Sequence, residues 1–298
     1  MPWYFFAALT PTLYSISNFI DKFLLDKKIK EPVAITALSS LISGILGIIF
    51  LAFMGFKILT PFQTLLIIGS GFLLTLYILP YYQVLRNEDA SRVVPLYQFI
   101  PVFTLILSAI FLKESLFPRQ IVGLVLIVVS GFLLSAEKIE AKIFKPRKAL
   151  WFMLLSGFMY GLIGILFRFV SKDASFWTVL GYEYVGSGMA GIALFLIPKV
   201  RESIRRQSGE LKSSLGILTV NEIIAVIAQM SEAYAVTLVA VPLVNMVGGI
   251  QPLLTLVIGI VLSTWFPHLI KEDIHKVAVA HKLISIIIIF AGLYLVYF

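Results

Sequence analysis

Long uninterrupted apolar runs are the feature that most constrains what this chain can fold into. Ten segments hold about 20 mostly apolar residues each, which is the length an α-helix needs to cross the hydrocarbon core of a bilayer. Their approximate bounds are Trp3–Leu25, Val33–Met54, Phe62–Leu85, Val93–Leu112, Arg119–Ser135, Ala149–Val170, Phe176–Ile197, Ser214–Val236, Val239–Leu262 and Val277–Tyr297. These segments leave too few residues for a separate soluble domain. We therefore expect an all-α integral membrane protein whose function lies in the bilayer or at its surfaces.

The composition supports this expectation. Apolar residues make up 59% of the chain and charged residues only 13%, whereas soluble proteins average about 45–50% and about 25%. These values exclude a cytosolic enzyme, a secreted domain and a disordered chain. The absence of cysteine excludes disulfides, thiolate metal sites and cysteine nucleophiles. The net charge of +8 falls in short loops, which indicates membrane topology rather than nucleic-acid binding.

The chain divides near Lys148 into two halves of five segments that share several motifs. The matched positions are Pro101 with Pro252, Phe117-Pro118 with Phe266-Pro267, Tyr14 with Tyr160, and Lys22 with Arg168, at offsets of 146 to 151 residues. Because five is odd, the second half must cross the membrane in the opposite sense. We expect two inverted five-helix repeats, residues 1–148 and 149–298, an architecture common in secondary transporters. Duplication also builds membrane scaffolds and membrane enzymes, so the repeat alone does not fix the function.

The most specific motif lies in the fourth segment. It reads Ala90-Ser91, then Pro101-Val-Phe-Thr-Leu, then Phe111-Leu-Lys-Glu114. This pattern resembles the EamA family of the drug/metabolite transporter superfamily, whose members end this helix with a similar Gly/Lys-Glu step. The resemblance covers essentially the whole chain and implies a ten-helix carrier with a central cavity, often exporting metabolites such as amino acids. The second half departs from the pattern, because Leu262-Ser-Thr-Trp265 stands where the glutamate is expected and about a dozen extra residues precede the last segment.

The loop charges give a prediction for the orientation in the membrane. Odd-numbered loops hold 17 of the 24 Lys and Arg residues and even-numbered loops hold 4. The positive-inside rule therefore places the odd loops in the cytoplasm and both termini outside. The family resemblance implies the reverse, and the sequence leaves both orientations open. We expect a multi-pass protein of the cell membrane.

Polar residues within the eighth segment are the strongest candidates for a site. Asn221, Glu222, Ala225, Gln229 and Glu232 fall on one helical stripe, and carboxylates in a bilayer are costly and usually functional. We expect Glu222 to bind a proton or a cationic group of the substrate. The alternative is a structural carboxylate tied to Asn221 or to a neighbouring helix. Glu232, nearer the segment's end, is expected among the lipid headgroups.

Further candidates lie in three other segments. Glu183 stands among glycines in the seventh, where it lines the cavity or bonds to a neighbouring helix. Prolines in the fourth and ninth segments predict helix kinks beside a site, although they can also serve only as bends. These prolines are Pro95, Pro101, Pro242 and Pro252, and the polar residues close to them are Tyr97, Gln98, Asn245 and Gln251.

Other polar positions are expected to have interfacial roles. Tyr81 and Tyr82 fit an aromatic belt, and Lys22 and Arg168 are expected to extend to the headgroups. The spacing of Ile270, Ile274 and Val277 predicts a short interfacial helix. The three histidines, His268, His275 and His281, are too far apart in sequence to predict a metal site.

These observations favour a secondary transporter, and an exporter in particular, of a small polar or amphipathic metabolite such as an amino acid. Alternating access of the two repeats, with proton coupling at Glu222, is the expected mechanism. No ATP-binding or hydrolase motif occurs, so we expect no enzyme activity and no cofactor or metal. The expected partners are a small-molecule substrate and the lipid bilayer but no nucleic acid, with a homodimer left open. A flippase for a lipid-linked headgroup is the main alternative, and a membrane scaffold is a weaker one.

Overall fold

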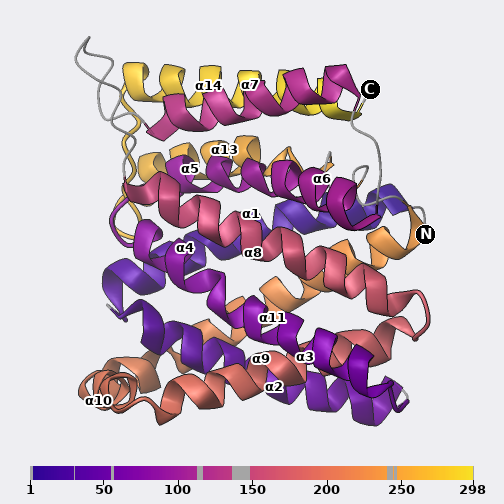
Figure 1. The fold of residues 1–298 in the computed structure, drawn as a ribbon. Coiled ribbons are helices and arrows are strands. Elements are labelled where there is room, and N and C mark those ends of the chain that lie inside the picture. The colour runs from indigo at the N-terminus through magenta and orange to yellow at the C-terminus, as the bar shows by residue number, and fades with distance from the viewer. Residues whose placement is uncertain are drawn as a thin grey trace.

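A computed structural model describes residues 3–29, 31–54, 57–112, 117–135, 148–239, 244 and 247–297. All regular structure in these residues is helical (Figure 1). The first half contains α1 (Trp3–Lys27), α2 (Pro32–Met54), α3 (Pro61–Leu76), α4 (Ile78–Leu85), α5 (Ala90–Val93), the 3-10 helix η1 (Val94–Gln98), α6 (Phe99–Leu112) and α7 (Pro118–Ser135). The second half contains α8 (Lys148–Ser171), α9 (Phe176–Leu196), α10 (Pro198–Arg206), α11 (Ser208–Leu238), α13 (Gln251–Trp265) and α14 (Lys276–Tyr297).

Within the described residues, seven helical segments are long and apolar enough to cross a membrane. They are Pro32–Met54, Pro61–Leu85, Ala90–Leu107, Lys148–Ser171, Phe176–Leu196, Ser208–Leu238 and Lys276–Val296. Shorter apolar helices cover Pro118–Ser130 and Gln251–Trp265. The prediction of an all-helical, multi-pass membrane protein is therefore confirmed.

The fourth and ninth predicted segments are not continuous helices. The fourth breaks into α5, η1 and α6, with Pro95 in the first turn of η1 and Pro101 in that of α6. In the ninth, regular helix over the described residues resumes at Gln251, with Pro252 in the first turn of α13. A first turn tolerates proline because its N–H groups have no partner within the helix. Pro242 and Asn245 lie outside the described residues.

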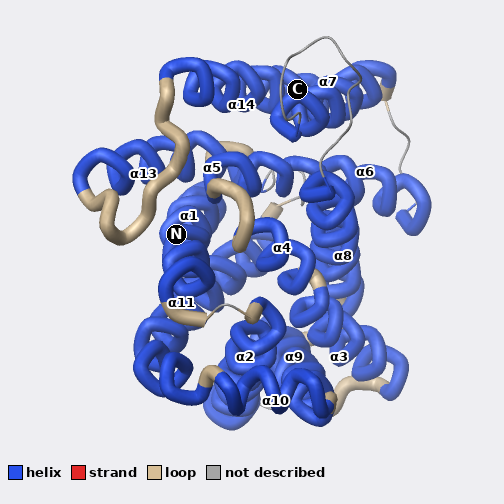
Figure 2. Tube along the Cα trace, turned by 90° about the vertical axis from the view of Figure 1, so that its left-hand side faces the viewer, coloured by secondary structure: helices blue, strands red, loops and turns tan. Residues whose placement is uncertain are grey.

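Helices at matching positions of the two halves pack against each other. α2 packs along α9, and α7 along α14. Both views show α7 and α14 together as an outer layer (Figures 1 and 2). The cross-pairs also correspond: α1 packs on α11 and α3 on α8, while α6 packs on α8 and α1 on α13. If each helix is replaced by its counterpart in the other half, the contact of α1 with α11 becomes that of α8 with α3. The contact of α6 with α8 likewise becomes that of α13 with α1.

Glycines permit the closest of these contacts. A Cβ atom added to Gly44 of α2 would lie 2.6 Å from the Cα of Gly188 in α9, and the reverse holds equally. A Cβ on Gly123 of α7 would lie 2.5 Å from the carbonyl oxygen of Gly292 in α14. Small residues allow such backbone approach between helices in membranes. No larger residue fits these positions unless the backbone moves.

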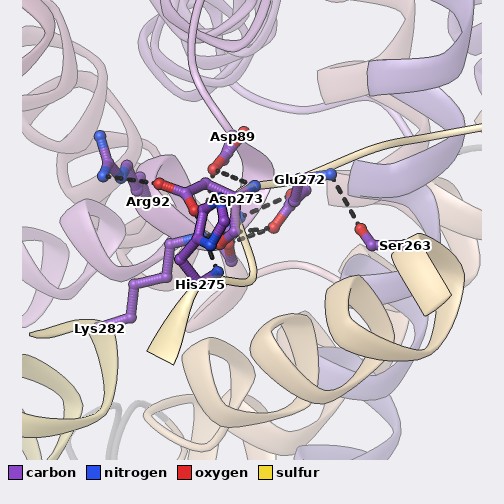
Figure 3. Close-up of polar contacts among 8 residues, drawn as sticks. Asp89, Arg92, Ser263, Glu272, Asp273, His275 and Lys282 are labelled. Atoms are coloured by element: carbon purple, nitrogen blue, oxygen red, sulfur yellow. Dashed lines mark hydrogen bonds and ion pairs between the residues drawn. The ribbon is translucent and has the colours of Figure 1, made fainter. Parts of the chain in front are cut away.

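The segment between α13 and α14 is an irregular loop, so the predicted interfacial helix is wrong. Its residues turn inward: Ile270 is buried, and so is Glu272, whose carboxylate is bound by the hydroxyl of Ser91 at the start of α5. The backbone N–H of Glu272 donates to Ser263 Oγ at 2.9 Å (Figure 3). These side-chain contacts replace helical hydrogen bonds and fix the loop against α5 and α13.

A buried lysine completes this cluster. Lys282 of α14 is 1% exposed, and its Nζ lies 3.1 Å from Asp89 Oδ2 and 3.8 Å from Glu272 Oε2. It also donates to Ser91 Oγ at 2.7 Å and to the carbonyl oxygen of Asp273 at 3.1 Å. Burial raises the pKa of Glu272, against the lowering effect of its hydrogen bond from Ser91 and of the Lys282 charge. The cluster joins the last helix to the start of the fourth segment.

Candidate substrate cavity

A polar cavity of about 140 Å³ lies between the two halves of the chain. Helices α1 to α4, η1 and α6 line it from the first half, and α8, α9, α11 and the start of α13 from the second. By the rule of thumb of about 10–15 Å³ per water-sized position, it holds roughly ten such positions. That volume suits a small molecule.

One end of the cavity is built around Asp21 of α1. Its carboxylate accepts hydrogen bonds from Asn221 Nδ2 at 2.6 Å, from the Tyr82 hydroxyl at 3.0 Å and from the Tyr81 hydroxyl at 3.3 Å. The Tyr81 hydroxyl also donates to Asn18 Oδ1 at 2.9 Å. The predicted interfacial belt is therefore wrong for Tyr81 and Tyr82, which are each 2% exposed. Their hydroxyls satisfy a buried carboxylate instead of reaching headgroups.

Lys22 also differs from its prediction. Its side chain is buried, and Nζ donates to the carbonyl oxygen of Leu85 at 2.9 Å and pairs with Asp26 at 3.1 Å. The lysine thus ties α1 to the end of α4 rather than extending to headgroups. It does not line the cavity.

Glu222 lines the cavity next to Asn221. Its carboxylate is bound by the hydroxyl of Ser43 on α2. The bond to α2 is the contact expected of a structural carboxylate, and the side chain lines the cavity as well. Its stripe neighbours Asn221, Ala225 and Gln229 also line the cavity, as the helical spacing predicts.

Glu183 lies behind this wall. It accepts from Ser70 Oγ of α3 at 2.6 Å and from Gln229 Nε2 at 3.4 Å, and Tyr184 donates to Gln229 Oε1 at 2.9 Å. It does not line the main cavity but borders an adjoining hollow of about 60 Å³. The bond to a neighbouring helix is thus the interpretation that the contacts favour.

Glu232 marks the other end of the cavity. It accepts from the Tyr160 hydroxyl at 2.7 Å, and the Tyr160 hydroxyl lies 3.2 Å from that of Tyr14. The expectation that Glu232 lies among headgroups is wrong, because the side chain turns inward and lines the cavity. Tyr14 and Tyr160 are positions matched in the sequence repeat, and they meet between the halves.

The remaining predicted residues are close to the cavity. Tyr97, Gln98, Pro101 and Gln251 line it, whereas Pro95 and Pro252 are buried beside it. Sequence reasoning predicted Asn221 but missed the roles of Asp21, Asn18, Tyr81 and Tyr82. The signal was present, since an acidic residue about 18 positions into an apolar segment is a site candidate by itself.

Charge is distributed unevenly over the lining. It contains three carboxyl groups, from Asp21, Glu222 and Glu232, and among the described residues no Lys, Arg or His. Tyrosine rings supply much of the remaining wall. Such a surface can bind positive charge or protons, and it offers nothing to neutralise an anion.

Comparison with known proteins agrees with the fold and with the sequence resemblance. The model of the EamA-like transporter family matches residues 1–136, nearly half of the chain. No curated protein matches the chain. Among the 28 matching chains of solved structures, one crystal structure of a protein covers 98% of this chain and 94% of its own, with a TM-score of 0.55 and 13% identity. This likeness concerns the fold alone.

Proposed function

We propose that the chain is a secondary-active carrier. The premise is the match of residues 1–136 to the EamA-like transporter family, which belongs to the drug/metabolite transporter superfamily. Ten membrane-crossing segments, as two inverted repeats of residues 1–148 and 149–298, would alternate in opening the cavity to either side. The exchange of helix neighbours between the halves supports this arrangement. So does the position of the termini, since α1 begins and α14 ends at the same end of the bundle (Figure 1). An even number of crossings requires that placement.

The observation that carries the proposal is the polar cavity itself. It is lined from both halves, so a relative movement of the halves changes its access. Carboxyl groups inside a membrane are expensive, and they mark substrate and ion pathways. Glu222, whose carboxylate is bound by the Ser43 hydroxyl and forms no ion pair with a cation among the described residues, is the proposed coupling group. The substrate is a small polar or amphipathic metabolite such as an amino acid, and export is the proposed direction.

Transport into proteoliposomes tests the proposal. We expect solute uptake that a pH gradient accelerates, and we expect Glu222→Gln to abolish the acceleration while leaving the protein folded. The matched control is Glu210→Gln, in the same helix but exposed, which should behave as wild type. Equal gradient-driven uptake by wild type and Glu222→Gln would refute the coupling role. Movement of labelled lipids without movement of any soluble metabolite would instead favour the flippase.

A further inference from the structure

The charges around the Asp21 end of the cavity restrict the class of substrate. This inference rests on the proposed function and concerns the same cavity. No cationic side chain lines it among the described residues, and the nearby Lys22 is held by the carbonyl oxygen of Leu85 and by Asp26. A carboxylate or phosphate entering the cavity would meet only like charges there. A positive group would meet attraction.

Two amide atoms of the Asp21 cluster have no hydrogen-bond partner among the described residues. Asn18 is 5% exposed and Asn221 is 2% exposed, and both line the cavity. Asn18 Nδ2 and Asn221 Oδ1 make no hydrogen bond, although the other amide atom of each residue is bound within the Asp21 cluster. Buried polar atoms are normally satisfied. An unused amide oxygen and an unused amide N–H within the Asp21 cluster match a ligand with an N–H donor and an oxygen acceptor.

Three tyrosine rings lie together at the Asp21 end of the cavity. The Tyr81 ring lies 5.3 Å from that of Tyr82 and 5.4 Å from that of Tyr97, measured between centroids. All three rings line the cavity. Rings of this kind attract ammonium groups through their faces.

We infer that the Asp21 end binds the ammonium group of a small organic amine that carries a neighbouring hydroxyl or carbonyl oxygen. The Asp21 carboxylate and Asn221 Oδ1 accept the N–H bonds. Asn18 Nδ2 donates to the oxygen of the ligand. The preferred substrate therefore has a net positive charge, and a free carboxylate weakens its binding.

A series of ligands that share one carbon skeleton tests this preference for a positive group, which we call the charge rule. We would measure binding to the purified full-length protein by thermal shift and calorimetry, using leucinol, leucinamide, isoamylamine, leucine and 4-methylpentanoate. We expect leucinol and leucinamide to bind best, leucine more weakly, and 4-methylpentanoate not at all. Equal binding of 4-methylpentanoate and leucinol, or a response to none of the amines, would overturn the inference.

Two variants test the named residues. Asp21→Asn keeps the shape and removes the charge, and it should weaken leucinol at least about tenfold because a charge-assisted hydrogen bond is lost. Asn18→Leu should weaken leucinol but leave isoamylamine, which has no oxygen, unchanged. A merely structural role of Asn18 would affect both ligands equally, and that result would contradict the assignment. Glu210→Gln serves as the control.

The failures of the two proposals are distinguishable. If liposomes transport an anionic solute and no amine binds, the charge rule fails and the carrier stands. If amines bind as expected but no solute moves, the carrier proposal fails and the binding site stands.

Discussion

Replacement of Lys282 by methionine removes the cation from the cluster that joins α14 to α5. Lys282 is 1% exposed, and the Glu272 side chain next to it is 2% exposed, whereas that of Asp89 is 21% exposed. Water can therefore solvate Asp89 after the substitution, but Glu272 is left as a buried carboxylate whose remaining donors are the hydroxyl and the backbone N–H of Ser91. Breaking a buried ion pair in this way costs about 3–5 kcal/mol.

Proton uptake by Glu272 sets an upper limit to that cost. A carboxyl group with an ordinary pKa near 4.3 can be kept protonated at pH 7 for about 3.7 kcal/mol, at 1.36 kcal/mol per pH unit. We therefore expect Lys282→Met to lose about 3 kcal/mol, and at most about 3.7 kcal/mol, of unfolding free energy at pH 7. The loss should shrink as the pH falls towards 5, because the proton then costs less.

The assay is unfolding by SDS in mixed micelles, followed by tryptophan fluorescence. In the double variant Lys282→Met, Glu272→Gln, no buried charge remains without a partner, so much of the loss should be recovered. Such coupling between neighbours is what a double-mutant cycle measures. The control is Lys276→Met, an exposed position at the start of the same helix. Additive losses, or a defect of Lys282→Met that does not change with pH, would refute the reasoning.

Two further predictions concern packing and pH. Gly188→Ala should destabilise the protein by about 1–3 kcal/mol, because the added Cβ would meet the Gly44 backbone. Gly164→Ala, where a Cβ meets open space, should be neutral or stabilising. Thermal unfolding in detergent measures both variants, and equal effects would contradict the packing argument. Burial raises the pKa of Glu272, so the folded state holds that proton more tightly, and the contribution of the group to stability is lost as the pH rises above the ordinary value. The stability of Glu272→Gln relative to wild type should therefore improve from pH 4.5 to 7, and a flat difference would count against the shift.

The sequence predicts the helical segments well because crossing a bilayer imposes length and apolarity together. It also predicts the α11 stripe, since helical spacing alone places Asn221, Glu222 and Gln229 on one face. The interruptions of the fourth and ninth helical segments are harder to predict. Apolarity continues through η1, where proline ends one hydrogen-bond pattern and begins another.

The errors share one physical origin. Tyr81, Tyr82, Lys22 and Glu232 all lie towards segment ends, where exposure to headgroups is the usual outcome. Each instead bonds to a partner on a helix distant in sequence. Glu272 belongs to the same class, because its partners Ser91 and Lys282 are contributed by two other segments. Such partners follow from tertiary packing, which the local pattern of one segment does not contain.

The central claim is that the cavity between the two halves is the path of transport. The chain has no cysteine, so a single introduced thiol reports without further engineering. Ala225→Cys places a thiol on the cavity wall between Glu222 and Gln229, and Ile223→Cys places one on an exposed position of the same helix. We would treat both variants with a charged methanethiosulfonate reagent in proteoliposomes and measure solute uptake. We expect modification to stop transport by Ala225→Cys, substrate to slow the modification, and Ile223→Cys to stay active. Full transport by a completely modified Ala225→Cys would contradict the central claim.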